Sequence, residues 1–88
     1  MRDYTIVGVH VTERATQAAE VHTVLSAYGA NIRTRLGLHE ADGTAASQHG
    51  LILLEAVGLE DRIDEMCDRL RRLRGVQVQR MFFSHPED

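Results

Sequence analysis

The chain has 88 residues, of which 43% are hydrophobic and 26% are charged, and its formal net charge is −3. This length allows one small domain and excludes a second core, while the composition is that of a folded globular chain rather than a disordered one. The acidic balance argues against direct nucleic-acid binding, because proteins of that class carry a basic excess. We therefore expect a single domain over residues 1–84, followed by a polar tail at residues 85–88.

The cellular compartment is indicated by the cysteine content. One cysteine, Cys67, excludes an internal disulfide and a four-cysteine zinc site, which fits a reducing compartment. No apolar run approaches the roughly 18 residues that span a membrane, and the N-terminus shows no signal-peptide cleavage pattern. We expect a cytoplasmic protein without a membrane partner.

The first half of the chain predicts a strand, a helix and a second strand. Tyr4–Val11 is rich in β-branched residues and alternates between two sides, as a strand does. Thr12 is predicted to cap the helix that follows, in which apolar residues recur at helical spacing. Gly29 is expected to end this helix in the left-handed conformation. The second strand is predicted at Asn31–Leu38.

The second half predicts a strand, a helix and a final strand. A polar loop leads from residue 39 to the most apolar run of the chain, residues 49–58, which is typical of a central strand. An amphipathic helix is predicted over Leu59–Gly75, with acids in its first turns and arginines in its last. A last strand is predicted at Val76–Phe83. The buried stripe of the second helix would consist of Ile63, Met66, Cys67, Leu70 and Leu73.

This order of elements predicts an α+β, ferredoxin-like βαββαβ fold, with a four-stranded antiparallel sheet and two helices on one face. The third strand is apolar on both sides, whereas a sheet with one solvated face should be polar outside. Two helices can cover only one face, so a second copy of the chain is the simplest cover for the other. We therefore expect a homodimer or a higher homo-oligomer. If the valines of the first strand face the helices, the opposite face receives Tyr4, Ile6, Gly8 and His10.

A ligand site is predicted where the first helix gives way to the second strand. Arg33 and Arg35 are separated by one residue on that strand and should therefore share a face. Arginine binds carboxylates and phosphates through paired hydrogen bonds, so we expect these two residues and Asn31 to bind an anionic effector. The alternative is that both arginines simply form the outer face of an edge strand.

Histidines suggest two further hypotheses. His39 and His49 lie at opposite ends of the loop between the second and third strands, and imidazole suits nickel, copper or zinc; the alternative is therefore a metal-responsive sensor. No tightly spaced metal motif is present and no cofactor is expected. His10 could act as a general base, which makes a small dimeric ferredoxin-like monooxygenase or isomerase a second alternative. Such an enzyme would need a pocket between sheet and helices.

A family resemblance covers nearly the whole chain. It is carried by the segments "VGVHV", "VLSAYGANIRTRLGL", "GLILLEAVG" and "LRRLRGVQVQ". Within them, Tyr28-Gly29 closes the first helix, Arg35 and Gly37 mark the second strand, and Gly75–Val78 begins the last. These features resemble the ACT-like regulators of the iron-only hydrogenase system. The resemblance implies an ACT-like oligomer with a regulatory role, such as a transcriptional regulator, and without enzymatic activity. Our first hypothesis is therefore a non-catalytic regulatory module that self-associates and binds a small effector or a partner protein at a subunit interface.

Overall fold

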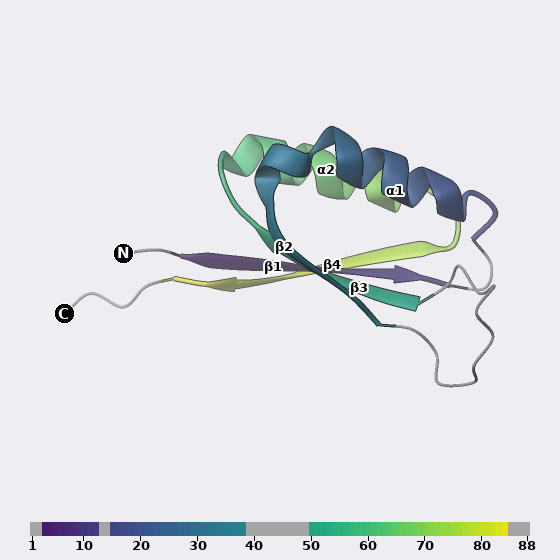
Figure 1. The fold of residues 1–88 in the computed structure, drawn as a ribbon, viewed down its shortest axis with the longest axis horizontal. Helices are drawn as coiled ribbons and strands as arrows, with labels where there is room; N and C mark the ends of the chain where they lie inside the picture. The colour runs from purple at the N-terminus through teal and green to yellow at the C-terminus, as the bar shows by residue number, and fades with distance from the viewer. Residues whose placement is uncertain (1–2, 13–14, 39–49, 85–88) are drawn as a thin grey trace.

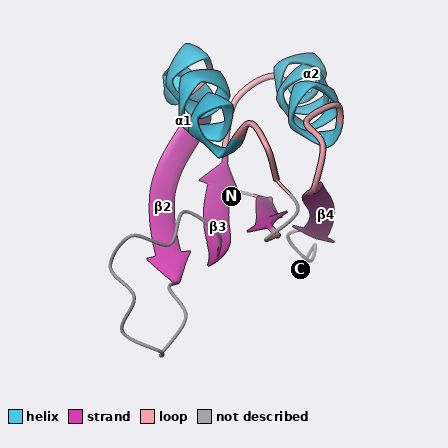
Figure 2. Cartoon of the chain, turned by 90° about the vertical axis from the view of Figure 1, so that its right-hand side faces the viewer, coloured by secondary structure: helices cyan, strands magenta, loops and turns pink. Residues whose placement is uncertain are grey.

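The structure is a computed structural model that describes residues 3–12, 15–38 and 50–84. Four strands form one antiparallel sheet in the order β2-β3-β1-β4, and both helices lie on the same face of it (Figures 1 and 2). The predicted ferredoxin-like βαββαβ fold is confirmed. The elements in chain order are β1 (Tyr4–Val11), α1 (Ala18–Ala27), a short 3₁₀ helix η1 (Gly29–Asn31), β2 (Ile32–Leu38), β3 (Gly50–Ala56), α2 (Glu60–Arg71) and β4 (Val76–Phe83).

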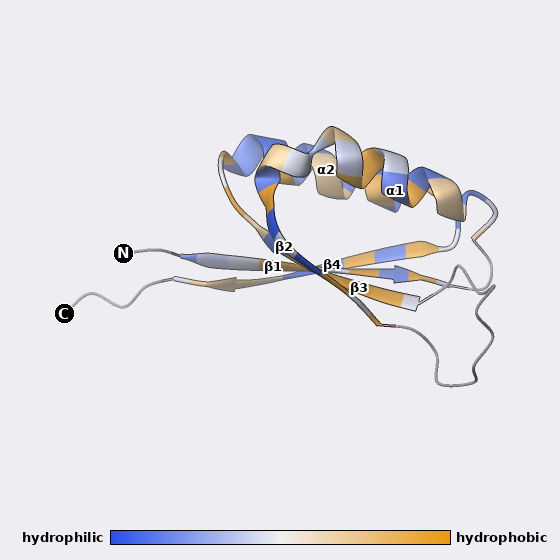
Figure 3. Ribbon diagram, in the orientation of Figure 1, coloured by the Kyte–Doolittle hydropathy of each residue, from blue (hydrophilic) through white to orange (hydrophobic). Residues whose placement is uncertain are grey.

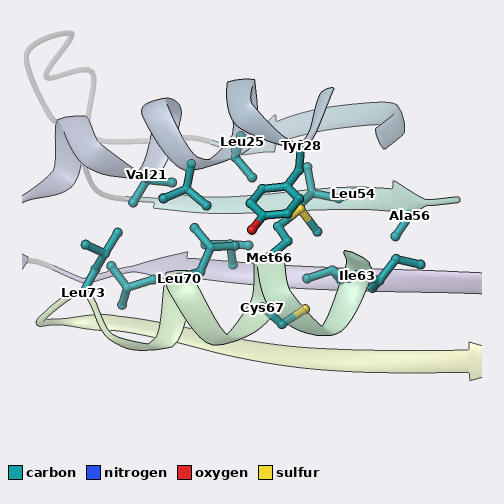
Figure 4. Close-up of a cluster of buried hydrophobic side chains, with 14 of the residues drawn as sticks. Val21, Leu25, Tyr28, Leu54, Ala56, Ile63, Met66, Cys67, Leu70 and Leu73 are labelled. Atoms are coloured by element: carbon teal, nitrogen blue, oxygen red, sulfur yellow. The ribbon is translucent and has the colours of Figure 1, made fainter. Parts of the chain in front are cut away.

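The core lies between the sheet and the helix layer (Figure 4). Val7 and Val9 of β1 are fully buried, and the register places Val7 opposite Leu54 of β3, which is also buried. Each aliphatic side chain buried in this way contributes about 1.5–3 kcal/mol. The predicted stripe of the second helix, Ile63, Met66, Cys67, Leu70 and Leu73, is confirmed as part of this core, although Leu73 lies just beyond the end of α2. From the first helix and its end the core contains Val21, Val24, Leu25 and Tyr28.

The predicted helix cap at Thr12 is wrong. Helix α1 begins at Ala18, and its N-cap residue, Gln17, makes no side-chain capping hydrogen bond. The Thr12 hydroxyl and backbone N–H both donate to the carbonyl of Gly75, at 2.7 and 2.9 Å. The reason is that Thr12 continues the line of β1, which pairs with β4 up to Val11 opposite Val76. Thr12 therefore joins the end of β1 to the turn before β4.

The predicted left-handed helix stop at Gly29 is also wrong. Helix α1 passes directly into the 3₁₀ helix η1, in which the Asn31 N–H donates to the Tyr28 carbonyl at 2.8 Å. Among the described residues, positive φ angles occur at Gly58 (+94°) and Gly75 (+78°). These two glycines form the turns that follow β3 and α2. Within the same part of the chain, neither helix has the length and hydrophobicity needed to span a membrane.

Candidate functional site

The face of the sheet opposite the helices carries a continuous set of largely apolar residues. The register places Gly8 opposite Leu53 of β3 and Gln79 of β4, so side chains at these levels share a side of the sheet. In Figure 3 most of β3 and the end of β2 are coloured hydrophobic. We call this surface the open face; its residues are Tyr4, Ile6, Gly8 and His10 of β1, Thr34, Leu36 and Leu38 of β2, Leu51, Leu53 and Glu55 of β3, and Gln77, Gln79, Met81 and Phe83 of β4.

Large apolar side chains are exposed across the whole open face. Six of them are between 36% and 53% exposed, and they come from all four strands. Contiguous exposed apolar patches mark interaction surfaces in soluble proteins. The open face is thus not a solvated outer surface of the usual polar kind. The six residues are Tyr4, Leu36, Leu38, Leu51, Met81 and Phe83.

A groove runs across the middle of the open face where Gly8 leaves out a side chain. A Cβ atom added to Gly8 would lie 3.8 Å from Leu53 Cδ2 and 3.9 Å from the Gln79 carbonyl, which are ordinary contact distances. Neither packing nor a positive φ angle therefore requires glycine here. The effect of the glycine is to leave space. The groove is lined by Ile6, Gly8, His10, Leu51, Leu53, Gln77, Gln79, Arg80 and Met81.

One end of the groove carries a polar pair that links β1 to β4. His10 Nδ1 lies 2.9 Å from Gln77 Oε1, because the two residues face each other in the β1–β4 register. An amide oxygen can only accept a hydrogen bond, so Nδ1 of His10 carries the hydrogen. In the neutral imidazole, Nε2 therefore presents a lone pair. Sequence reasoning placed His10 on this face but missed Gln77, which only the strand register reveals.

The predicted ligand residue Asn31 is buried at the corner between η1 and β2. Its side-chain Nδ2 donates to the Val57 carbonyl at 3.0 Å, and the Val57 N–H donates to the Asn31 carbonyl at 2.8 Å. Asn31 thus ties the first half of the chain to the end of β3. Its binding of an effector stays a prediction, while its structural role is evident from these bonds.

The two predicted arginines lie on the edge strand β2, and a β-bulge falls at Arg33. The register shifts between Ile32 and Thr34, which interrupts the alternation from which a shared face of Arg33 and Arg35 was predicted. Arg35 pairs with Leu54 and so points toward the helices, where its Nη2 lies 2.6 Å from His22 Nδ1. Anion binding by Arg33 and Arg35 stays a prediction.

The predicted metal ligands, His39 and His49, lie outside the described residues. Within residues 3–12, 15–38 and 50–84, no group of three or more histidine, cysteine, aspartate or glutamate side chains is placed to hold a metal ion. Cys67 is fully buried in the core, and this burial raises the pKa of its thiol. An uncharged, enclosed thiol behaves as a small hydrophobic side chain.

Sequence reasoning did not identify the role of Arg80 in joining β4 to α2. Its Nη2 lies 2.7 Å from Glu60 Oε1, and its Nη1 is bonded to Asp64. The hydrogen bond to Asp64 raises the pKa of Arg80. The sequence did contain a signal for this role. Val76, Val78 and Arg80 alternate along β4 and so share its inward side, where a charged residue needs a partner of opposite charge. The Arg80 guanidinium is therefore engaged on the helix side, although the residue also borders the groove.

Comparison with solved structures shows the fold. The chain is similar to the uncharacterized protein TM1266 from Thermotoga maritima, with 21% identity, a TM-score of 0.73, and coverage of 94% of this chain and 98% of that one. It is similar to the ACT domain from the GTP pyrophosphokinase of Chlorobium tepidum (23% identity, TM-score 0.59, coverage 90% and 96%). It is also similar to SnoaB, a cofactor-independent oxygenase from Streptomyces nogalater (14% identity, TM-score 0.52, coverage 100% and 97%).

No protein-family model and no curated protein sequence matches the chain. The structural similarities support an ACT-like, ferredoxin-like fold over nearly the full chain.

Proposed function

We propose that this protein is a non-catalytic, ACT-like regulatory module that associates with itself through the open face and binds a small effector or a partner protein at that interface. The observation that carries the proposal is the set of six large apolar side chains exposed on the open face. Burying apolar surface contributes about 25 cal/mol for each Å² removed from water. A second copy of the chain offers an equally apolar surface, as a two-fold symmetric dimer requires.

The charges of the open face favour a second copy as the partner. Among the open-face residues Glu55 is the only carboxylate, and it accepts a hydrogen bond from the Thr34 hydroxyl at 3.0 Å. None of the open-face residues is an arginine. Two such faces meet without strong like-charge repulsion. The outer side of α2 is different, because Arg62 and Glu65 form one exposed ion pair there and Arg71 and Asp68 form another.

The absence of catalysis is supported by the place of His10. The enzymatic alternative needs a pocket between sheet and helices, with His10 as the base. His10 lies on the open face, because it alternates with the buried Val9 and Val11 along β1. The space between sheet and helices is filled by fully buried side chains such as Val9, Met66 and Leu70. The fold is shared by an ACT domain and by an oxygenase, so it is the position of His10, and not the fold, that speaks against catalysis.

For the regulatory target we propose the iron-only hydrogenase system. The support is the sequence resemblance carried by Tyr28-Gly29, Arg35, Gly37 and Gly75–Val78, together with the ACT-like fold. Deletion of the gene in an organism that makes this hydrogenase should change hydrogenase transcript levels or activity. Unchanged transcript and activity in the deletion strain would contradict this target while leaving the self-association untouched.

Self-association is tested by light scattering of the purified chain and two matched variants. We expect a mass of at least twice the 9.9 kDa chain at micromolar concentration. Met81 and Phe82 are neighbours on β4 and are 53% and 59% exposed, but the register places Met81 on the open face and Phe82 on the helix side. Met81→Glu should give a monomer, whereas Phe82→Glu should keep the wild-type mass.

The same experiment can contradict the proposal in two ways. A wild-type chain that is monomeric at this concentration would remove its basis. An oligomer that survives Met81→Glu but dissociates with Phe82→Glu would place the interface on the other side of the sheet. Circular dichroism of both variants checks that each remains folded.

A further inference from the structure

We propose that the groove around Gly8 is the effector site and that its ligand is an uncharged aromatic compound with a hydroxyl group. This inference rests on the proposed function, because it locates and characterises the ligand of the open-face interface. It places the site in the middle of the sheet rather than at the corner of Asn31, Arg33 and Arg35.

The shape of the groove favours a flat, apolar ligand. Its floor is the backbone at Gly8, and its apolar walls come from Ile6, Leu51, Leu53 and Met81. Neighbouring strands lie only about 4.7–4.9 Å apart, so a flat ring laid over the glycine can contact side chains of β3 and β4 at once. Met81 adds a thioether, which makes favourable contacts with ring edges.

The polar end of the groove favours a hydroxyl group. In its neutral form His10 presents a lone pair at Nε2, because Nδ1 is the nitrogen that donates to Gln77 Oε1. The side-chain NH₂ group of Gln77 and the amide of Gln79 are donors that line the same groove. A hydroxyl group donates one hydrogen bond and accepts others, so it matches an acceptor and donors that lie side by side.

The charges around the groove disfavour ionic ligands. Among its lining residues Arg80 alone has a permanent charge, and its guanidinium is bound to Glu60 and Asp64 on the opposite side of the sheet. A bound carboxylate or ammonium group would lose its hydration without gaining an opposite charge, at a cost of several kcal/mol. A neutral ligand avoids this cost.

The second copy of the chain would complete the site. In the single chain the groove is open toward the side from which a partner sheet would approach, and sheets packed face to face lie about 10 Å apart. The partner would close the groove and exclude water from the ligand. A ligand that binds only the closed groove stabilises the dimer by mass action, so the effector would control the assembly state of the protein.

The inference is tested by titrating the ¹⁵N-labelled full chain with 2-naphthol and, separately, with 2-naphthoate. These probes share one ring system and differ in carrying a hydroxyl or a carboxylate. We expect 2-naphthol to shift the amide resonances of Gly8, Leu53 and Gln79 together with the Gln77 side-chain NH₂, and 2-naphthoate to bind at least tenfold more weakly. Absence of shifts at millimolar 2-naphthol, shifts confined to the helices, or equal affinity for both probes would overturn the inference.

Two variants connect the binding to the groove. Gly8→Val should abolish 2-naphthol binding, because the new side chain fills the groove, and the space around Gly8 and the strand preference of valine allow folding. His10→Ala should weaken 2-naphthol binding about tenfold without changing the affinity for 2-naphthoate. Unaltered 2-naphthol affinity in both variants would show that the site lies elsewhere.

Light scattering separates this inference from the proposed function. Wild-type protein that is oligomeric but fails to bind 2-naphthol contradicts the ligand assignment alone. Wild-type protein that is monomeric with and without 2-naphthol contradicts the self-association on which the assignment rests. An increase of mass on adding 2-naphthol at a protein concentration near the dissociation midpoint would support both.

Discussion

Replacement of Gly58 by alanine should destabilise the fold through two separable effects. The φ angle of Gly58 is +94°, a conformation that residues with a Cβ rarely adopt. A Cβ atom at this position would also lie 2.7 Å from Nδ2 of Asn31, which is closer than real Cβ contacts come. The Asn31 side chain would have to move, and it would then lose its hydrogen bond to the Val57 carbonyl.

The two effects can be given magnitudes. A left-handed backbone costs a residue with a Cβ about 1–2 kcal/mol. Loss of the Asn31–Val57 hydrogen bond costs about 0.5–1.5 kcal/mol. We therefore expect Gly58→Ala to reduce the free energy of unfolding by about 1.5–3.5 kcal/mol, and the melting temperature to fall by about 4–8 °C for each kcal/mol in a domain of this size.

A double-mutant cycle separates the two effects. Asn31→Ala alone should cost about 1 kcal/mol, because it removes the hydrogen bond. In the Asn31→Ala background the clash is absent, so Gly58→Ala should cost only the backbone part, about 1–2 kcal/mol. Urea unfolding followed by circular dichroism gives all four free energies, measured at one protein concentration because self-association adds to apparent stability.

The cycle refutes the reasoning if the two substitutions are simply additive, since the contact between Asn31 and position 58 would then carry no energy. A Gly58→Ala variant as stable as the wild type would refute both parts of the argument, including the need for glycine at this φ angle.

Two further predictions concern α2 and its contacts. Arg80→Met should reduce the free energy of unfolding by about 1 kcal/mol, because it removes the ion pairs with Glu60 and Asp64. This loss should be smaller in 1 M NaCl, which screens ion pairs. An equal loss at low and high salt would show that packing of the Arg80 side chain is responsible instead. Burial raises the pKa of the Cys67 thiol above its ordinary value of 9.0, so its contribution to stability should be fully present below pH 9.0 and lost as the pH rises through the folded pKa. Urea titrations of wild type and Cys67→Ala across this range measure the difference, which should decrease with pH, and iodoacetamide should label Cys67 only as the protein unfolds.

The order and type of the elements followed from local patterns in the sequence. Strand β4 occupies Val76–Phe83 as predicted, and the stripe of α2 is buried as predicted, because alternation and helical spacing record directly which side chains face the core. The prediction at Thr12 was wrong because Thr12 bonds to a residue far away in the chain. The prediction at Gly29 was wrong because the helix continues into a 3₁₀ helix instead of ending at a left-handed residue. The bond from Thr12 to Gly75 spans 63 positions of the chain, so no local pattern reveals it.

The candidate site was less predictable than the fold. The apolar character of β3 on both sides pointed to the open face, and this local feature of the sequence was sufficient for that. The groove depends on the register that sets Gly8 beside Leu53 and Gln79, and register results from pairing between distant segments. The β-bulge near Arg33 belongs to the same class of features, which is why the spacing of the two arginines was a poor guide to their direction.

The pairing of β1 with β4 also determines when the protein can fold during synthesis. Tyr4 lies opposite Phe83, so β1 and β4, the first and last strands along the chain, are neighbours in the sheet (Figure 1). Strand β1 can pair with β3 once residues 50–56 have left the ribosome, but its other edge stays unpaired until residues 76–83 emerge. During that interval an apolar strand with free backbone groups is available to other nascent chains. The sheet is therefore completed only after the last strand has been synthesised.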